Sequence, residues 1–200
     1  MSTSDVEGLR ERTRRAVRVE VAQVGMALFA RQGYEETTVE DVARAAGMSR
    51  RTFFRHFPSK EDILLSNQRE VGESVADELA RRPGDEPPWL ALRRAFDPVI
   101  ARMDAASDRT RRLLTVVNET PALQAAQLAR RSRWRDLLVP RLLARLPPED
   151  GARVELRAEA LVCGALACYE GTHLGWLAAG GAATLSTLLD ESMTAVAPLR

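Results

Sequence analysis

The stretch from Thr37 to Lys60, TTVEDVARAAGMSRRTFFRHFPSK, constrains the fold of this chain more than any other. Thr38 is followed three residues later by Asp41, a spacing typical of a helix start that two side chains cap reciprocally. Apolar residues with helical spacing come next: Val39, Val42, Ala43 and Ala46. Gly47 supplies a left-handed residue that ends this helix, and Ser49 caps the next helix after a tight bend. The stretch therefore predicts a helix-turn-helix.

The second helix of this pair has an inward and an outward side. Phe53 and Phe57 lie four residues apart and are expected to face inward. The remaining side chains then point away from the core: Arg50, Arg51, Thr52, Phe54 and Arg55. A guanidinium group can donate two hydrogen bonds to guanine, and Thr or Phe can contact the methyl group of thymine, so this side suits the major groove of DNA. The alternative is a solvated basic helix on an ordinary helical domain.

The helix that follows suits a phosphate, and the charge distribution agrees with a polyanionic partner at this end. Ser59 caps the helix, whose open amides and the ammonium group of Lys60 can bind an anion. Residues 1–60 contain 11 Lys and Arg against 8 Asp and Glu, whereas the whole chain has a formal net charge of only +1. The positive excess lies where DNA is expected.

Residues 14 to about 65 resemble the DNA-binding domain of the TetR family of bacterial transcriptional regulators. The matching motifs, in order, are FARQGY at 29–34, TTV at 37–39, VA at 42–43, AG at 46–47, FFRHF at 53–57 and SKE at 59–61. The resemblance implies DNA contacts from Thr38, Ser49, Arg50, Arg51, Thr52, Phe54, Arg55, His56 and Lys60. Many relatives have Tyr where this chain has Phe54, so a hydroxyl bond to phosphate is lost there. For His56, a local hydrogen bond at the helix end is an equal alternative.

The rest of the chain is expected to be helical, which makes the fold class all-α. We predict a flexible N-terminal tail over 1–13, a helix-turn-helix domain over 14–60, and a ligand-binding and dimerisation domain over 61–200. A long helix from Ser59 to about Arg82 joins the two domains and, in the resembling family, is the lever between ligand and DNA. Pro98 and Pro140 are expected to kink two later helices, because proline removes a helical hydrogen bond.

Large side chains on these later helices are candidate walls of an apolar ligand cavity: Trp89, Phe96, Met103, Trp134, Tyr169 and His173. The alternative for each is ordinary core packing. The sequence favours an apolar or amphipathic effector, and the run 51–62 is similar to that of TetR-family regulators that sense acyl-CoA-like molecules. The other candidate is a cationic or aromatic drug, as for regulators of multidrug efflux genes. An acidic residue facing the cavity would favour the cation, and an arginine there would favour the acyl-CoA.

The last two helices, 150–179 and 184–196, are expected to form a homodimer interface. Small residues recur on one side of the first: Ala160, Gly164, Ala167, Gly171 and Gly175. Each glycine costs about 1 kcal/mol in a helix interior relative to alanine, so close packing of another helix is expected to compensate. The alternative is packing of this stripe within the chain.

Catalysis, cofactors and metal binding are not expected. The sequence has no phosphate-binding glycine loop, no HExxH and no GxSxG motif. Cys163 and Cys168 lack the spacing of a zinc site or a disulfide framework, which points to a cytoplasmic location. The sequence predicts neither a signal peptide nor a transmembrane stretch, so no membrane step is expected. A Cys/His enzyme or redox sensor built on Cys163 and His173 is the remote alternative to a ligand-responsive repressor bound to a palindromic operator.

Overall fold

The computed structural model describes residues 3–147 and 153–199, and within these ranges the chain is helical and contains no strand. The helices are α1 (Thr3–Gln32), α2 (Val39–Ala45), α3 (Arg50–His56), α4 (Glu61–Arg81), α5 (Pro88–Ala95), α6 (Asp97–Ala105), α7 (Ser107–Glu119), α8 (Pro121–Leu143), α9 (Arg153–Ala178) and α10 (Leu185–Val196). The predicted all-α fold is confirmed. Among the described helices, none combines the length and the hydropathy that a bilayer span requires.

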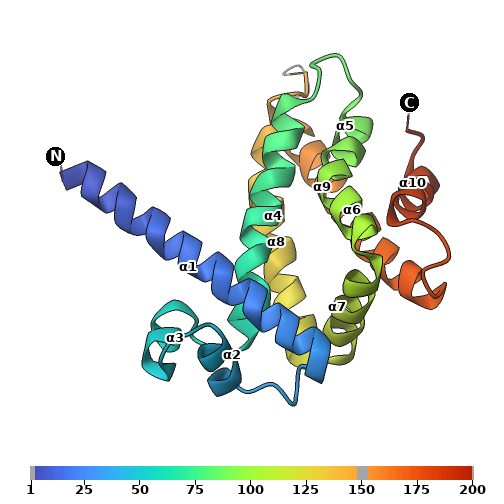
Figure 1. Ribbon diagram of the computed structural model, residues 1–200. Helices are drawn as coiled ribbons and strands as arrows, with labels where there is room; N and C mark the ends of the chain where they lie inside the picture. The colour runs from blue at the N-terminus through green and yellow to red at the C-terminus, as the bar shows by residue number, and fades with distance from the viewer. Residues whose placement is uncertain (1–2, 148–152, 200) are drawn as a thin grey trace.

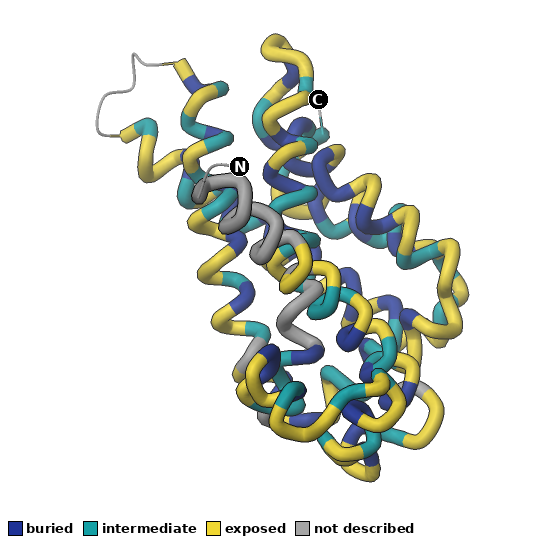
Figure 2. Tube along the Cα trace, turned by 60° about the vertical axis from the view of Figure 1, so that its left-hand side comes forward, coloured by how far each residue is buried: buried dark blue, intermediate teal, exposed yellow. Residues whose placement is uncertain are grey.

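The helices form two layers that share α4. Figure 1 shows α2 and α3 below the long diagonal α1, whereas α4 rises from this end and runs beside α8. The buried parts of the chain lie where helices face one another, and the outer sides of the helices are exposed (Figure 2). One apolar core is formed by α1, α2, α3, the start of α4 and Leu123 of α8. The other is formed by residues of the helices from α4 through α10. The first core therefore includes the corner between α7 and α8 as well as the helix-turn-helix.

The N-terminal helix is longer than expected. α1 begins at Thr3, so residues 3–13, which we predicted as a flexible tail, continue the helical backbone. Glu, Leu and Arg are good helix formers, so a polar composition without an apolar stripe does not prevent a helix. α1 ends at Gln32, directly before Gly33, whose φ of 94° only glycine adopts readily.

The two internal prolines have different effects. The segment from Trp89 to Met103, predicted as one kinked helix, is divided at Phe96 into α5 and α6, with Pro98 in the first turn of α6. The missing N–H of proline is tolerated at this position, because the first turn of a helix has no intrahelical acceptors for its amides. Pro140 remains inside α8, which continues to Leu143. Phe96 is therefore held at a corner between two short helices.

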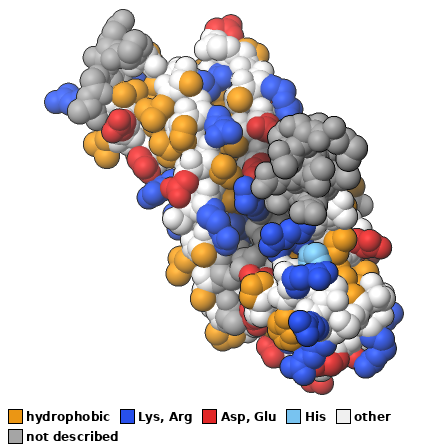
Figure 3. Space-filling model, turned by 90° about the vertical axis from the view of Figure 1, so that its left-hand side faces the viewer, with side chains coloured by type: hydrophobic (Ala, Val, Ile, Leu, Met, Phe, Trp, Pro, Cys, Tyr) orange, Lys and Arg blue, Asp and Glu red, His pale blue; other side chains and the backbone are white. Residues whose placement is uncertain are grey.

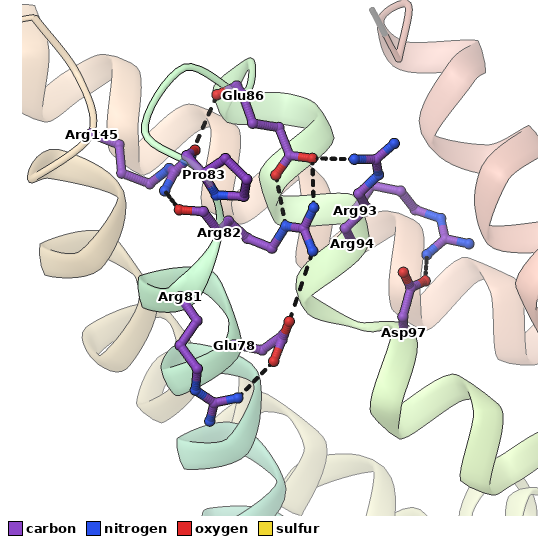
Figure 4. A network of polar contacts seen from close by, with 9 residues as sticks. All are labelled: Glu78, Arg81, Arg82, Pro83, Glu86, Arg93, Arg94, Asp97 and Arg145. Carbon is purple, nitrogen blue, oxygen red and sulfur yellow. Dashed lines mark hydrogen bonds and ion pairs between the residues drawn. The ribbon is translucent and has the colours of Figure 1, made fainter.

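A polar network fixes the upper end of α4 (Figure 4). The carboxylate of Glu86 accepts two hydrogen bonds from Arg82, at 2.7 and 2.8 Å, and one from Arg94 at 2.5 Å. Arg145, just after α8, donates to the backbone carbonyls of Arg82 and Pro83. The hydrogen bonds from Arg82 and Arg94 hold the pKa of Glu86 below its usual range although burial opposes this. The end of α4 is thereby tied to α5 and α8.

Candidate nucleic-acid interface and effector site

The caps of the helix-turn-helix are formed as predicted. The amide of Asp41 donates to the Thr38 hydroxyl at 3.1 Å, and the amide of Thr38 donates to the Asp41 carboxylate at 3.0 Å. The hydrogen bonds from Thr38 lower the pKa of Asp41. Gly47 has a φ of 65°, and the hydroxyl of Ser49 accepts from the Thr52 amide at 3.1 Å. These contacts fix the bend between α2 and α3.

The inward side of α3 anchors the helix to α1. Phe53 and Phe57 are fully buried and stack with their ring centroids 5.4 Å apart, as the four-residue spacing predicts. The guanidinium of Arg18, on α1, donates to the backbone carbonyl of His56 and lies 4.7 Å from the Phe57 ring centroid. The position of α3 is thus fixed from behind by both apolar packing and a cation–π contact.

The outward side of α3 presents arginine and aromatic groups to solvent. Arg50, Arg51 and Arg55 are exposed, Thr52 is half-buried, and Phe54 is 40% exposed. Figure 3 shows Lys and Arg side chains gathered at this lower end of the molecule, with acidic side chains near its edge. On this side of α3, Arg50 pairs with Glu40 of α2 at 3.0 Å. This pair is solvated, so it contributes little and can be exchanged for a phosphate or base contact.

Of the predicted contact residues, His56 is buried and Lys60 is bonded within the chain. The His56 side chain is buried, and burial, followed by the charges of Arg55, Arg14 and Arg18, lowers its pKa, so that it is neutral at physiological pH. The ammonium of Lys60 donates to the Tyr34 carbonyl at 2.8 Å and lies 4.0 Å from the Tyr34 ring centroid. Nδ1 of His56 is buried and has no hydrogen-bond partner among the described residues, so the expected local hydrogen bond is not formed at this atom, and the DNA contacts of both residues stay predictions.

In the second layer, five of the six predicted ligand residues lie together. We call Phe96, Met103, Trp134, Tyr169 and His173 the aromatic cluster. The Tyr169 ring is at its centre: its centroid lies 4.9 Å from Phe96 in a stacked arrangement, 5.6 Å from Trp134 and 4.4 Å from the edge-on ring of His173. The Tyr169 hydroxyl donates to the sulfur of Met103 at 3.7 Å. The cluster thus brings α6, α8 and α9 to one point.

Two polar groups of the aromatic cluster, on His173 and Tyr169, are poorly satisfied. Nε2 of His173 is buried and has no hydrogen-bond partner among the described residues, and the Tyr169 hydroxyl has a thioether as its acceptor. Burial, with a smaller effect of the nearby Arg130 charge, lowers the pKa of His173 to about 3, and burial raises the pKa of Tyr169 to about 12. Both groups are therefore neutral. Buried polar groups normally find partners, so an added molecule with a hydrogen-bonding group would be stabilised here.

An ion pair that the sequence analysis missed borders the cluster. Arg130 of α8 is 5% exposed, its guanidinium lies 5.4 Å from the Trp134 ring centroid, and it donates to the Glu170 carboxylate at 3.2 Å. Arg130 belongs to a run of charged residues that resembles a solvated face. Its spacing of four residues from Trp134 was the signal that it lies on the same buried side of α8.

Trp89 does not belong to the aromatic cluster. Its indole N–H donates to the carbonyls of Met193 and Ala197, at 3.3 and 3.1 Å, so it joins α5 to α10. The predicted ligand role of Trp89 thus has no support from this arrangement. A separate surface pocket of about 380 Å³ lies between α7 and α9, and it contains none of the six predicted ligand residues; its lining is Arg111, Thr115, Asn118, Glu119, Leu174, Leu177 and Ala178.

The stripe of small residues on α9 is mostly exposed. Ala160, Ala167, Gly171 and Gly175 face solvent, and a Cβ added at either glycine would meet nothing within 4 Å. Leu156 and Leu174 are 71% and 54% exposed on the same helix. Gly164 differs, because a Cβ added there would lie 3.5 Å from the Trp89 ring, so this member of the stripe packs within the chain. The other four leave an apolar helix face open to a partner.

The cysteines form no disulfide or metal centre among the described residues. Cys163 is half-buried and Cys168 is buried, and both are free thiols. No group of three or more His, Cys, Asp or Glu side chains in the described ranges has an arrangement suited to a metal ion.

Comparison with known proteins relates both layers of this fold to regulators. Residues 22–66 match the model of bacterial regulatory proteins of the tetR family, and residues 86–199 match the MftR C-terminal domain. The chain is 37% identical over 137 residues to the HTH-type transcriptional regulator TcmR of Streptomyces glaucescens, a match that covers 64% of this chain. The matched part is 60% of the length of that relative.

Solved structures with the same fold include complexes with small molecules. FadR of Thermus thermophilus, a repressor in complex with lauroyl-CoA, has a TM-score of 0.56 and 24% identity, covering 88% of this chain and 91% of its own. SmeT, the repressor of a Stenotrophomonas maltophilia multidrug efflux pump, has been solved with triclosan. That complex has a TM-score of 0.61 and 22% identity, covering 90% of this chain and 91% of its own. At these identities the likeness establishes the fold alone.

Proposed function

Because the chain belongs to the tetR family of bacterial regulatory proteins and carries an MftR-type C-terminal domain, we propose that it is a homodimeric, ligand-responsive repressor acting in the cytoplasm. It binds a palindromic DNA operator through α3 and leaves it when a small apolar or amphipathic effector binds. The family and the matched relatives are transcriptional regulators rather than enzymes.

The observation that carries this proposal is the outward side of α3. Arg51 and Arg55 lie one turn apart and are exposed, and Phe54 beside them is an exposed aromatic on a helix that is rigidly supported from behind. A helix fits the major groove, where guanidinium groups recognise guanine and apolar groups contact thymine methyls. Phe54 contacts Phe53 and Arg50, but among the described residues the guanidinium groups of Arg51 and Arg55 form no ion pair or hydrogen bond.

Effector binding is proposed at the aromatic cluster. The cluster is apolar apart from the neutral Tyr169 and His173, whose polar atoms lack good partners. Arg130 and Glu170 beside it carry opposite charges and pair with each other, so the site favours neither a strong cation nor a strong anion. The ligand that fits is amphipathic, with an apolar body and at least one hydrogen-bonding group.

The efflux-regulator alternative has one observation in its favour. The Glu170 carboxylate is partly exposed and accepts contacts from both Arg130 and Arg131, at 3.2 and 3.6 Å. A cationic drug would compete with these guanidinium groups for the Glu170 carboxylate. The thioester or head group of an acyl-CoA-like ligand would instead make additional contacts with the guanidinium groups. The two effector classes are therefore separated by Glu170→Gln, which weakens binding of a cation and not of an acyl-CoA.

Dimerisation is proposed through α9 and α10. The exposed members of the α9 stripe let a second helix approach closely, and Val196 of α10 is 64% exposed. Two copies related by a twofold axis present two α3 helices to successive major grooves. A redox sensor built on Cys163 has less support, because Cys163 and Cys168 are both free thiols and form no disulfide with each other.

Fluorescence anisotropy with DNA from upstream of the protein's own gene tests the proposed function. We expect binding at least about 10³-fold tighter than to a scrambled fragment of the same length. Affinity should fall with added salt for both fragments, because phosphate contacts release counterions. Equal affinity for native and scrambled DNA at every salt concentration would contradict a sequence-specific regulator at that site.

A further inference from the structure

Trp134 connects the aromatic cluster directly to the backbone of α4. Its side chain is 1% exposed, and its indole N–H donates to the Gln68 carbonyl at 2.8 Å. That carbonyl belongs to the middle of α4, the helix that joins the DNA-binding layer to the second layer. Trp134 is therefore attached to the main chain of α4 and not to a flexible side chain.

Gly72 makes this attachment possible. A Cβ at residue 72 would lie 2.5 Å from Nε1 and 2.6 Å from Cδ1 of Trp134, closer than any real Cβ contact. Glycine is otherwise unfavourable inside a helix by about 1 kcal/mol relative to alanine. The indole edge thus occupies the space that any other residue at position 72 would fill, one helical turn after Gln68.

The other side of Trp134 belongs to the aromatic cluster. Its ring centroid is 5.6 Å from that of Tyr169, and the Arg130 guanidinium lies over it at 5.4 Å. An effector that reorganises Tyr169 or His173 must therefore displace or reorient the indole. Close-packed interiors transmit such a shift because they have no free volume to absorb it.

The two ends of α4 are held in different ways. At its upper end, Glu86, Arg82 and Arg145 tie α4 to α5 and α8. At its lower end, α4 carries the DNA-binding layer through the Tyr34 hydroxyl, which donates to the Glu61 carboxylate at 2.7 Å. Gly72 lies between these two ends of α4. A sideways force on α4 at Gly72 therefore acts between an upper end that is fixed and a lower end that moves with α3.

We propose that Trp134 is the positioning residue that transmits effector occupancy to α4, through its hydrogen bond to Gln68 and its contact with Gly72. This inference rests on the proposed effector response and names the contact that carries it. A displaced indole moves α4 about its upper end and changes the placement of α3 relative to the DNA.

Two substitutions and two matched controls test this role. Trp134→Phe keeps an aromatic ring but removes the N–H that bonds to Gln68. Its control is Trp176→Phe, because Trp176 is 2% exposed and its N–H also bonds to a backbone carbonyl at 2.8 Å, that of Ala183, away from α4. Gly72→Ala forces the indole and α4 apart. Its control is Gly84→Ala, where an added Cβ meets nothing within 4 Å.

The first measurement needs no effector. Hydrogen–deuterium exchange of peptides from α4 should be faster in Trp134→Phe than in the wild-type protein, and unchanged in Trp176→Phe. Gly72→Ala should bind the upstream DNA at least about fivefold more weakly than Gly84→Ala, the lower end of the usual coupling range. Two results together would overturn the role of Trp134. Exchange in α4 would be the same in the two tryptophan variants, and DNA affinity would be the same in the two glycine variants.

The second measurement adds lauroyl-CoA or triclosan as the probe. In the wild-type protein, an active probe should weaken DNA binding by about 5- to 150-fold, and in Trp134→Phe this factor should fall to about twofold or less. An undiminished factor in Trp134→Phe would overturn the inference. If neither probe acts on the wild-type protein, the proposed response to these molecules fails, while the exchange and Gly72→Ala results still decide the Trp134 contact.

Discussion

The guanidinium of Arg82 donates two hydrogen bonds to the carboxylate of Glu86, at 2.7 and 2.8 Å. The Glu86 side chain is only 5% exposed, and it also accepts from Arg94. Arg82, which directly follows α4, is thereby joined to Glu86, which lies just before α5. Because α4 links the two layers, this pair fixes one end of the element that both proposed sites share.

Substitution of Glu86 with Gln should destabilise the fold. A buried, charge-assisted hydrogen bond contributes about 1.5 to 3 kcal/mol, and Gln cannot satisfy Arg82 and Arg94 together. Urea unfolding should show a loss in this range. The control is Arg81→Gln, because Arg81 is 67% exposed in its pair with Glu78 and should cost less than about 1 kcal/mol. Equal losses in the two variants would contradict the role assigned to Glu86.

The stability of the protein should fall between pH 6.5 and 5 because of His173. The pKa of His173 is about 3 in the folded protein, against about 6.5 for an unperturbed histidine, so the unfolded chain binds a proton at a higher pH than the folded protein does. Stability is then lost as pH falls below about 6.5, by up to about 1.4 kcal/mol per pH unit. His173→Phe should flatten this dependence in urea unfolding across the window, more than His56→Gln does. An unchanged slope in His173→Phe would show that the imidazole is not buried in its neutral form.

Replacement of Arg51 or Arg55 with Ala should reduce binding to the native DNA fragment by about 1 to 3 kcal/mol, since each lost base contact has this magnitude. The sequence preference should relax at one position of each half-site. Anisotropy with native and scrambled fragments measures both effects, and Arg102→Ala on α6 is the control, because Arg102 is exposed and lies in the other layer. Equal losses on both fragments would show that these arginines contact phosphate alone.

Gly171→Leu should produce monomers that bind DNA weakly. The exposed stripe on α9 is open at this position, and a leucine would hold a partner helix away. Gly164 is unsuitable for this test, because it packs against Trp89 within the chain. Sedimentation velocity measures the result, with Ala80→Leu on the exposed side of α4 as the control. A dimer retained in Gly171→Leu would remove the stripe from the interface.

The helix-turn-helix was predictable because its signals are local. Thr38, Gly47 and Ser49 act on backbone groups within four residues, and the spacing of Phe53 and Phe57 indicates one buried side. These elements formed as expected. The start of α1 was predicted too late, because residues 3–13 are polar and carry no apolar periodicity that would indicate a helix.

The proposed effector site was predictable only in part, because the aromatic cluster depends on contacts between distant helices. The aromatic residues could be identified by size and hydropathy, but their assembly around Tyr169 follows from how α6, α8 and α9 cross. Trp89 has the same side chain as Trp134, yet it lies between α5 and α10 and outside the aromatic cluster. Burial of Arg130 and the contact of Gly72 with Trp134 depend on tertiary packing that a single sequence does not contain.

Hydroxyl-radical footprinting on the upstream DNA tests the central claim most directly. A dimer that places one α3 in each of two successive major grooves should protect two patches on one face of the duplex, with centres about 34 Å or about 10 base pairs apart, or a multiple of this distance. The two protected sequences should be related by an inverted repeat. A single protected patch, or uniform protection along the fragment, would contradict operator recognition by a pair of α3 helices.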